Sequence, residues 1–195
     1  MVRHETAQGF VPACNDGAAA ARGELIAFLN NDTEVTSGWL DELAAAFDRF
    51  PDVGLAGAKL IYPDGRLQEA GGIVWGTGDP WNAGRGGEPD DPAWNYPREA
   101  DYLSGAAIMV RRDVWDEVGG FGAEWAPAYF EDTDLAFKVR AAGKRVVYVP
   151  TAEVYHFEGG TAGVDKTEGP KRFQELNRPK FKKKWKKAYA AHGPV

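Results

Sequence analysis

Asp32 is the first residue whose position suggests chemistry. It closely follows the apolar run 25–29, which is typical of a strand buried on both faces. Open α/β sheets bind ligands beyond the carboxyl ends of such strands, and a carboxylate there can hold a divalent cation that neutralises a diphosphate. Residues 30–33 could equally cap the helix expected over 38–50. Metal binding and capping both remain open.

Three acids within four residues, Glu131, Asp132 and Asp134, stand at the start of a helix expected over 131–142. Acids in a first turn complement the helix dipole, but one or two suffice for that. The two aromatic residues that precede them would partly desolvate one carboxylate and raise its pKa, as a general base requires. The pattern therefore favours a general base over a purely structural cluster.

His156 ends a strand expected over 152–156, ahead of Gly159-Gly160. Alone it reads as a satisfied core histidine; beside two acidic sites at strand ends it becomes a candidate ligand for a manganese-class ion. Two further features carry alternatives of the same kind. Gly120 could admit a ligand close to the backbone or only help to end a helix, and Trp125 could stack on a sugar or fill the core.

The elements that must position these residues alternate between helix-like and strand-like patterns, which indicates an α/β fold. A long loop rich in Gly, Pro, Asp and Trp is expected over 76–97. The expected helices are 15–22, capped by Asn15 or Asp16, then 38–50, 112–118 and 131–142; the expected strands are 25–29, 53–59, 102–110, 146–149 and 152–156.

Composition narrows the class of protein. The 195 residues are 44% hydrophobic and 27% charged, which fits one globular domain. Cys14 is the single cysteine, which excludes an internal disulfide and a cysteine-rich zinc site and fits a reducing, cytoplasmic setting. No apolar run is long enough for a transmembrane helix, and a net charge of −6 argues against nucleic acid as a partner.

The charge is unevenly distributed. The segment from Pro170 to Lys187 contains nine basic residues and one acidic residue, which is a net charge of +8. Because the whole chain has a net charge of −6, the rest of the chain has a net charge of −14. We therefore divide the chain into a domain over 1–165 and a basic, helical tail over 166–195. The tail is either a solvated helix face or a surface for anionic lipid headgroups or a phosphorylated substrate, which would place the protein at the inner face of a membrane.

In their order along the chain, these segments resemble the family 2 glycosyltransferases of the GT-A fold, particularly the bacterial rhamnosyltransferase-like branch. Each piece is short, but the ordered set is specific and extends to about Gly160. The matching pieces are Gly9-Phe10, Asn15-Asp16-Gly17, Leu29-Asn30-Asn31-Asp32-Thr33-Glu34, Ser104-Gly105-Ala106, Val118-Gly119-Gly120-Phe121, Phe130-Glu131-Asp132-Thr133-Asp134-Leu135 and His156.

The resemblance implies an inverting, metal-dependent enzyme that moves a sugar from a nucleotide-diphosphate sugar to a glycan or lipid-linked acceptor. Asp132 would be the catalytic base, and Asp32 and His156 would hold Mn²⁺ or Mg²⁺. The resemblance further assigns donor contacts to Asn15, Asn30 and Asp32, and acceptor contacts to Glu131, Gly120 and Trp125. One base, one metal ion and no protein nucleophile suffice for a single in-line displacement.

Two departures from the family pattern bear on these expectations. Gly122 stands where the family commonly has an aspartate after Gly-Gly-Phe, so acceptor contacts there should differ. Family members also begin with a strand–helix–strand segment that carries the nucleotide-base pocket, and this sequence opens after it. We therefore expect an N-terminally truncated mixed sheet flanked by helices. The alternative functions are a catalytically incomplete, carbohydrate-binding remnant of such an enzyme and an unrelated metal-dependent phosphate-ester hydrolase.

Overall fold

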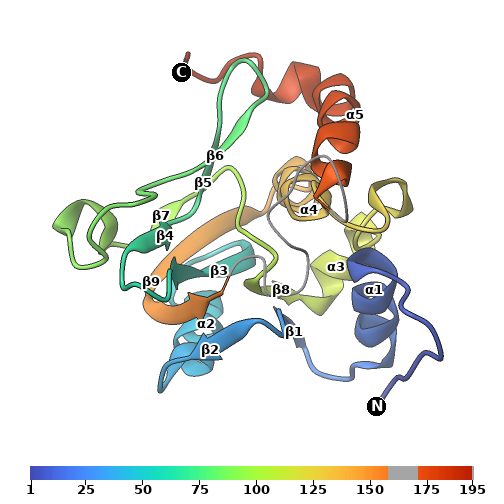
Figure 1. Ribbon diagram of the computed structural model, residues 1–195, viewed down its shortest axis with the longest axis horizontal. Helices are drawn as coiled ribbons and strands as arrows, with labels where there is room; N and C mark the ends of the chain where they lie inside the picture. The colour runs from blue at the N-terminus through green and yellow to red at the C-terminus, as the bar shows by residue number, and fades with distance from the viewer. Residues whose placement is uncertain (158–170, 195) are drawn as a thin grey trace.

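A mixed β-sheet forms the centre of the protein in the computed structural model, which describes residues 1–157 and 171–194 (Figure 1). The sheet runs in the order β1 (Leu25–Leu29), β8 (Ala107–Arg111), β3 (Val53–Ile61), β9 (Arg145–His156) and β2 (Thr33–Val35), with β4 (Leu67–Glu69) beside β3 and β7 (Arg98–Glu99) beside β9. Only β3 and β9 pair in parallel among these strands. All nine residues of β3 are buried, as expected for a central strand covered on both faces.

Helices cover both faces of the sheet. On one face α2 (Trp39–Arg49) packs Leu43 and Ala46 against alternate side chains of β3 and β9. On the other face lies the larger core, to which four helices contribute: α1 (Phe10–Ala20), α3 (Arg112–Val118), α4 (Glu131–Ala141) and α5 (Arg172–Tyr189). This arrangement confirms the predicted α/β sheet flanked by helices.

The loop expected over 76–97 contains short regular elements. β5 (Gly72–Val74) and β6 (Pro80–Asn82) form a two-stranded hairpin, and the 3₁₀ helix η1 (Pro92–Trp94) follows. A second 3₁₀ helix, η2 (Ala123–Trp125), precedes α4. Lys59 of β3 fixes the long loop to the sheet: its buried ammonium donates to the Pro89 carbonyl at 3.1 Å, Asn95 Oδ1 at 2.7 Å and Glu153 Oε1 at 2.8 Å.

Four expected elements differ from the structure. The strand expected over 102–110 begins only at Ala107. The first helix begins at Phe10 after Gly9 rather than at residue 15, so neither Asn15 nor Asp16 caps it. β1 lies at the edge of the sheet, with Ala27 and Leu29 exposed, because β8 is its one partner among the described strands. β9 continues through Pro150 as a single strand, with a register irregularity against β3 between Ala58 and Lys59.

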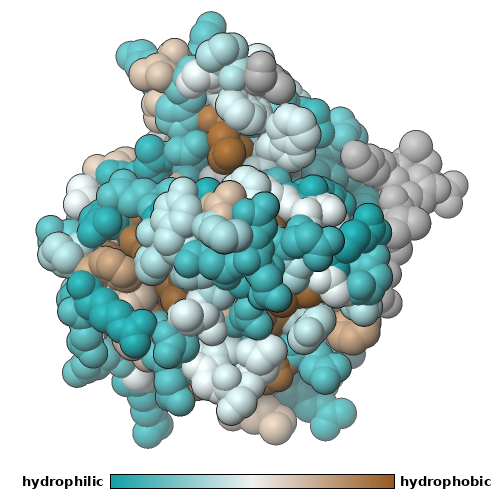
Figure 2. All heavy atoms as spheres, turned by 90° about the vertical axis from the view of Figure 1, so that its left-hand side faces the viewer, coloured by the Kyte–Doolittle hydropathy of each residue, from teal (hydrophilic) through white to brown (hydrophobic). Residues whose placement is uncertain are grey.

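The basic tail is helical, as predicted, and α5 belongs to the main core. Phe181 and Asn177 are fully buried, and Asn177 donates to the carbonyl oxygens of Trp125, Ala128 and Tyr129 at 3.0–3.2 Å. Lys180, although exposed, extends this contact by donating to Asn177 Oδ1 at 2.8 Å and to the Glu124 carbonyl at 3.2 Å. No helix in the described part of the chain is both long and apolar enough to cross a membrane. Figure 2 shows one face of the molecule, mostly hydrophilic, with hydrophobic side chains in small separate patches.

Candidate active site

Asp32 and His156 meet at the end of two paired strands. Antiparallel pairing of β2 with β9 sets Thr33 opposite His156, and the Phe157 amide donates to the Asp32 carbonyl at 2.9 Å. The two side chains then approach to 3.3 Å between His156 Nε2 and Asp32 Oδ1. The structure therefore brings together the two residues that the sequence predicts as metal ligands.

Gln68 of β4 orients the imidazole from the other side, with its Oε1 atom 3.1 Å from His156 Nδ1. An amide oxygen accepts hydrogen bonds, so this contact places the ring proton on Nδ1, and the lone pair of Nε2 then lies on the side of Asp32. One carboxylate and one imidazole suit a manganese-class ion. In the described part of the chain no group of three or more His, Cys, Asp or Glu residues surrounds a common point. The pair thus fits a metal that takes its other ligands from a diphosphate and water.

Asp132 lies half-buried in the first turn of α4. Its Oδ2 atom accepts from the Gly105 amide at 3.1 Å, and Oδ1 accepts from the Thr133 amide at 2.6 Å and the Thr133 hydroxyl at 3.1 Å. Burial raises the pKa of this carboxyl, and the three donors lower it in part. A partly accessible, oriented carboxylate with a raised pKa has the properties of a general base.

Glu69 of β4 is a second carboxylate beside Asp132. Its Oε1 atom accepts from the Ser104 amide at 2.9 Å, so the consecutive amides of Ser104 and Gly105 each hold one acid. Glu69 is 1% exposed, and burial, helped by the negative Asp132, raises its pKa to about 8. Its Oε2 atom is buried without a hydrogen-bond partner. Of the two acids, Asp132 has the larger set of donors and is therefore the one better able to carry the charge.

The other two acids of α4 have different neighbours. Glu131 is buried, and burial together with Asp132 raises its pKa well above the ordinary range; its charge in turn acts on Cys14 of α1. Asp134 is fully buried and accepts from Trp185 Nε1 at 2.7 Å, with Lys184 Nζ also at 2.7 Å. The three acids therefore have different partners, and among the three it is Asp132 that accepts a hydrogen bond from the Gly105 amide.

Two successive residues with left-handed backbone, Tyr129 (φ 77°) and Phe130 (φ 72°), set the direction of this turn. Non-glycine residues adopt such angles at a cost of about 1–3 kcal/mol each, and they cluster at functional sites. Asn177 of α5 holds the Tyr129 carbonyl in place. The tail helix thus supports the loop that presents Asp132.

The structure does not bring every predicted residue to this site. Asn15 is occupied elsewhere: its amide donates to the Phe121 carbonyl at 2.9 Å, and its Oδ1 accepts from the Phe121 amide at 3.1 Å. Gly120 is buried against the Trp115 ring, and its carbonyl accepts from Lys138. Glu131 is likewise buried away from the surface.

Trp125 requires a correction. It has no exposed surface, packs with its ring 6.4 Å from that of Phe130, and lies beneath the ammonium of Lys184. A side chain enclosed in this way cannot stack on an acceptor, and its tryptophan ring fills the core instead. Asn30 stays close to the site, because its amide donates to the Ala106 carbonyl at 2.9 Å, one residue beyond the amide that holds Asp132.

Comparison with known proteins shows the family. The sequence profile described as "Glycosyl transferase family 2" matches residues 1–119, which is more than half of the chain. The chain belongs to glycosyl transferase family 2.

Two curated relatives are bacterial proteins of this kind. The O-antigen biosynthesis protein RfbC of Myxococcus xanthus is 36% identical over 161 residues, which cover 79% of this chain and 12% of RfbC. The N-acetylglucosaminyl-diphospho-decaprenol L-rhamnosyltransferase of Mycobacterium tuberculosis is 32% identical over 151 residues, which cover 70% of this chain and 48% of the relative. The chain thus spans less than half the length of each.

Among solved structures, GalNAc-T7 in complex with UDP, GalNAc and Mn²⁺ superposes with a TM-score of 0.71 at 16% identity, over 96% of this chain and 37% of that one. At this identity the match shows the fold alone, which is the GT-A fold predicted from the sequence.

Two members of the site, Gln68 and Glu69, were not found from the sequence. They are consecutive residues of β4, and one orients His156 while the other lies beside Asp132. Together with Ser104-Gly105 they connect the Asp32–His156 pair to Asp132. The sequence feature that could have identified them is the polar Gln-Glu pair directly before Ala70-Gly71-Gly72. The strand is only three residues long, which is too short for a strand pattern to be recognised in the sequence.

Proposed function

We propose that this chain carries the catalytic site of an inverting glycosyltransferase that moves a sugar from a nucleotide-diphosphate donor to a hydroxyl of a glycan or lipid-linked acceptor. The observation that carries the proposal is the placement of Asp132. It is an oriented, half-buried carboxylate with a raised pKa, connected through β4 and the 104–106 loop to the Asp32–His156 pair.

In this proposal Asp132 accepts the proton of the acceptor hydroxyl while that oxygen attacks the anomeric carbon. The bond from the anomeric carbon to the diphosphate oxygen breaks on the opposite face, and the electron pair leaves with the diphosphate. Asp32 and His156 would hold a Mn²⁺ or Mg²⁺ ion, whose charge stabilises the leaving diphosphate. Asn30, two residues before Asp32, faces the donor.

The donor half of the proposal is tested by thermal unfolding with UDP, dTDP or GDP, each with and without Mn²⁺. We expect one nucleotide to raise the melting temperature only when the metal is present, and expect this shift to disappear in Asp32→Ala. Asp41→Ala, on the exposed surface of α2, is the matched control and should retain it. Glycan binding that needs neither nucleotide nor metal would favour the carbohydrate-binding alternative instead.

The base is tested by transfer to a panel of acceptors: methyl glycosides of common hexoses and a short-chain N-acetylglucosaminyl diphospholipid. Asp132→Asn should lower kcat by about 10²–10⁴-fold, because an amide cannot accept the proton. The metal-dependent nucleotide shift should stay as in the wild type. Turnover unchanged by Asp132→Asn would refute the assignment of the base.

We further propose that the exposed lysines of α5 bring the protein to an anionic membrane surface, where a lipid-linked acceptor would lie. Lys183, Lys186 and Lys187 are exposed, whereas Lys182 and Lys184 are engaged with Asp79 and with Glu124 and Asp134. Anionic headgroups attract such clusters by roughly 1 kcal/mol per basic residue.

A further inference from the structure

We propose that the cleft beside the β5–β6 hairpin is a carbohydrate-binding subsite, in which Trp81 stacks on a pyranose ring of the acceptor glycan. This inference rests on the proposed function and deepens it, because it names a surface that holds the acceptor. The cleft has a volume of about 400 Å³, which is within the range of pockets that take small ligands. Its lining includes Trp75, Trp81, Asn82, Arg85 and Trp94.

The first support is the exposure of Trp81. The side chain lines the cleft, yet 54% of its surface is accessible to solvent, in contrast to the fully enclosed Trp125. Its ring lies at 66° to that of Trp75, with 6.3 Å between the ring centroids, so the Trp75 ring supports it in an edge-to-face contact. The C–H bonds of a pyranose pack well on the electron-rich face of such a ring. Trp81 is therefore accessible to a sugar.

The second support is that hydrogen bonds hold the base of the cleft in place. The 83–87 turn is attached to β4 and to the residues that follow this strand. The Ala83 amide donates to the Gly71 carbonyl at 2.9 Å, and the Gly86 amide donates to the Leu67 carbonyl at 2.8 Å. A cleft formed before the ligand arrives avoids the entropic cost of ordering a loop on binding.

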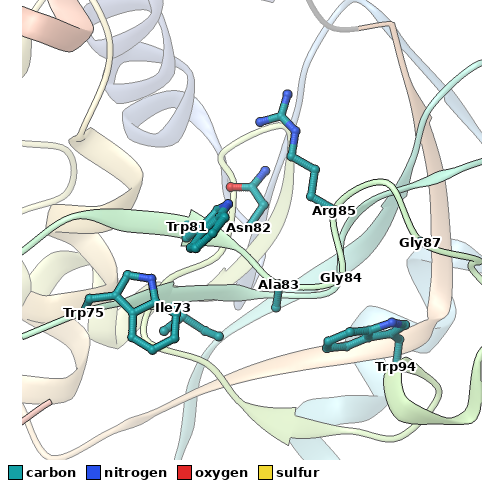
Figure 3. A pocket seen from close by; sticks show the side chains of 9 residues that line it. All are labelled: Ile73, Trp75, Trp81, Asn82, Ala83, Gly84, Arg85, Gly87 and Trp94. Atoms are coloured by element: carbon teal, nitrogen blue, oxygen red, sulfur yellow. The ribbon is translucent and has the colours of Figure 1, made fainter. Parts of the chain in front are cut away.

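Trp94 is the second aromatic side of the cleft, and its ring is also fixed. The ring packs closely over Gly84, where an added Cβ would lie 3.0 Å from two ring carbons. The guanidinium carbon of Arg98 lies 5.0 Å from the centroid of the same ring. Figure 3 shows Trp75 and Trp94 on either side of Ala83 and Gly84. The cleft thus has aromatic side chains at both ends.

The third support is a small number of polar groups in the lining. Figure 3 shows Asn82 and Arg85 extending to the same side, away from Trp94. The Tyr102 hydroxyl donates to Asn82 Oδ1 at 2.7 Å, which leaves the Asn82 amide nitrogen as the donor for a ligand. Arg85 is exposed and adds guanidinium donors. Aromatic surface with a few placed donors is the combination that a polyhydroxylated ring requires.

The fourth support is the position of the cleft next to the loop that holds Asp132. Tyr102 bridges to Gly72 of β5, whose amide donates to the Tyr102 carbonyl at 2.9 Å, and its side chain binds Asn82 of β6. Three residues later, the Gly105 amide donates to Asp132. The Tyr102 phenol is also close enough to Asp132 for the two groups to interact electrostatically. The substrate that must reach Asp132 is the acceptor, so the cleft is assigned to the acceptor.

The test compares the wild type with Trp81→Ala, Trp81→Tyr and a matched control, Tyr96→Ala, which removes an aromatic side chain that is 50% exposed and outside the lining. Binding of the methyl glycosides of the acceptor panel is followed by saturation-transfer NMR, with the stabilising nucleotide and Mg²⁺ present. Acceptor KM, donor KM and kcat are measured with the donor and acceptor that support transfer.

Trp81→Ala should lose the NMR signal of the bound sugar and raise acceptor KM about tenfold, because the stacking face is removed. Its donor KM and kcat should stay within about twofold of the wild type, since the donor does not occupy the cleft. Trp81→Tyr keeps an aromatic face and should raise acceptor KM by no more than about threefold. Tyr96→Ala should behave as the wild type.

Transfer with an unchanged acceptor KM in Trp81→Ala would overturn the inference and leave the proposed function intact. A rise in donor KM, or loss of the metal-dependent nucleotide shift in Trp81→Ala, would also overturn it, because the cleft would then serve the donor or the fold. If the wild type binds nucleotide and metal without transfer, the proposed function fails and the NMR measurement decides alone. Sugar binding that disappears in Trp81→Ala would then support the cleft, and absence of sugar binding would overturn it.

Discussion

Replacing Glu69 by Gln should change how the stability of the fold depends on pH, whatever the acceptor. The carboxyl titrates at about 8 in the folded protein, against 4.5 ordinarily, chiefly because it is buried. Between these values the unfolded chain has released a proton that the folded protein still holds. Folding stability from this group is therefore fully present below pH 4.5 and is lost as the pH rises through 8.

The loss amounts to about 1.4 kcal/mol per pH unit, or roughly 3–4 kcal/mol between pH 5 and 8, if the carboxylate gains no new contact on ionising. Gln has the same shape, keeps the Ser104 hydrogen bond and does not ionise. Its stability relative to the wild type should accordingly increase steadily from pH 5 to 8 and level off above pH 8. Asp132 and Glu131, which also have raised pKa values, are present in both chains and cancel to first order.

The assay is urea unfolding at five pH values from 5 to 9, followed by tryptophan fluorescence, with the difference in the free energy of unfolding plotted against pH. Glu117→Gln, an exposed glutamate of α3, is the matched control and should give a flat difference. A flat line for Glu69→Gln as well would refute the reasoning, because it would mean that the carboxyl ionises as easily in the folded protein as in the unfolded chain.

Two further predictions concern α5. Phe181→Ala should lower the free energy of unfolding by about 3–5 kcal/mol, because Phe181 is fully buried in an aromatic cluster. The control Lys183→Ala should leave the free energy of unfolding nearly unchanged. A loss below about 1 kcal/mol for Phe181→Ala in the same urea titration would mean that α5 is not docked on the core. Reversing the charges of Lys183, Lys186 and Lys187 to Glu should weaken cosedimentation with anionic vesicles at least tenfold; equal binding by both forms would make these lysines a solvated face.

Local sequence patterns were sufficient for most of the secondary structure. The helical spacing of apolar residues and Pro51 delimited α2, and Gly119-Gly120 marked the end of α3. The candidate metal ligands and the candidate base were also singled out from the sequence, because strand ends and helix starts are marked by abrupt changes from apolar to polar side chains. The predicted start of α1 was wrong, since Gly9 at a φ of 87° begins the helix without a side-chain cap.

Burial separates the predicted site residues that lie near one another from those that are enclosed in the core. Asn15, Gly120 and Trp125 belong to the family pattern, but the structure uses all three to pack α1, α3 and α4 against one another. Whether a conformationally special glycine or a tryptophan faces solvent or a core depends on which segments cover it. Those segments lie more than a hundred residues away in the case of Asn15 and Phe121, so no local pattern contains that information.

The sequence by itself indicated the family and the order of most elements, and it singled out Asp32, Asp132 and His156 as candidate site residues, because these follow from residue types and their short-range spacing. Only the tertiary structure places the Gln68-Glu69 pair between His156 and the loop that holds Asp132. Nothing in residues 67–70 alone distinguishes these side chains from an ordinary polar edge strand. Their position arises when β4 pairs with β3 and the amides of Ser104 and Gly105, from elsewhere in the chain, each bind one carboxylate, which sets Glu69 beside Asp132.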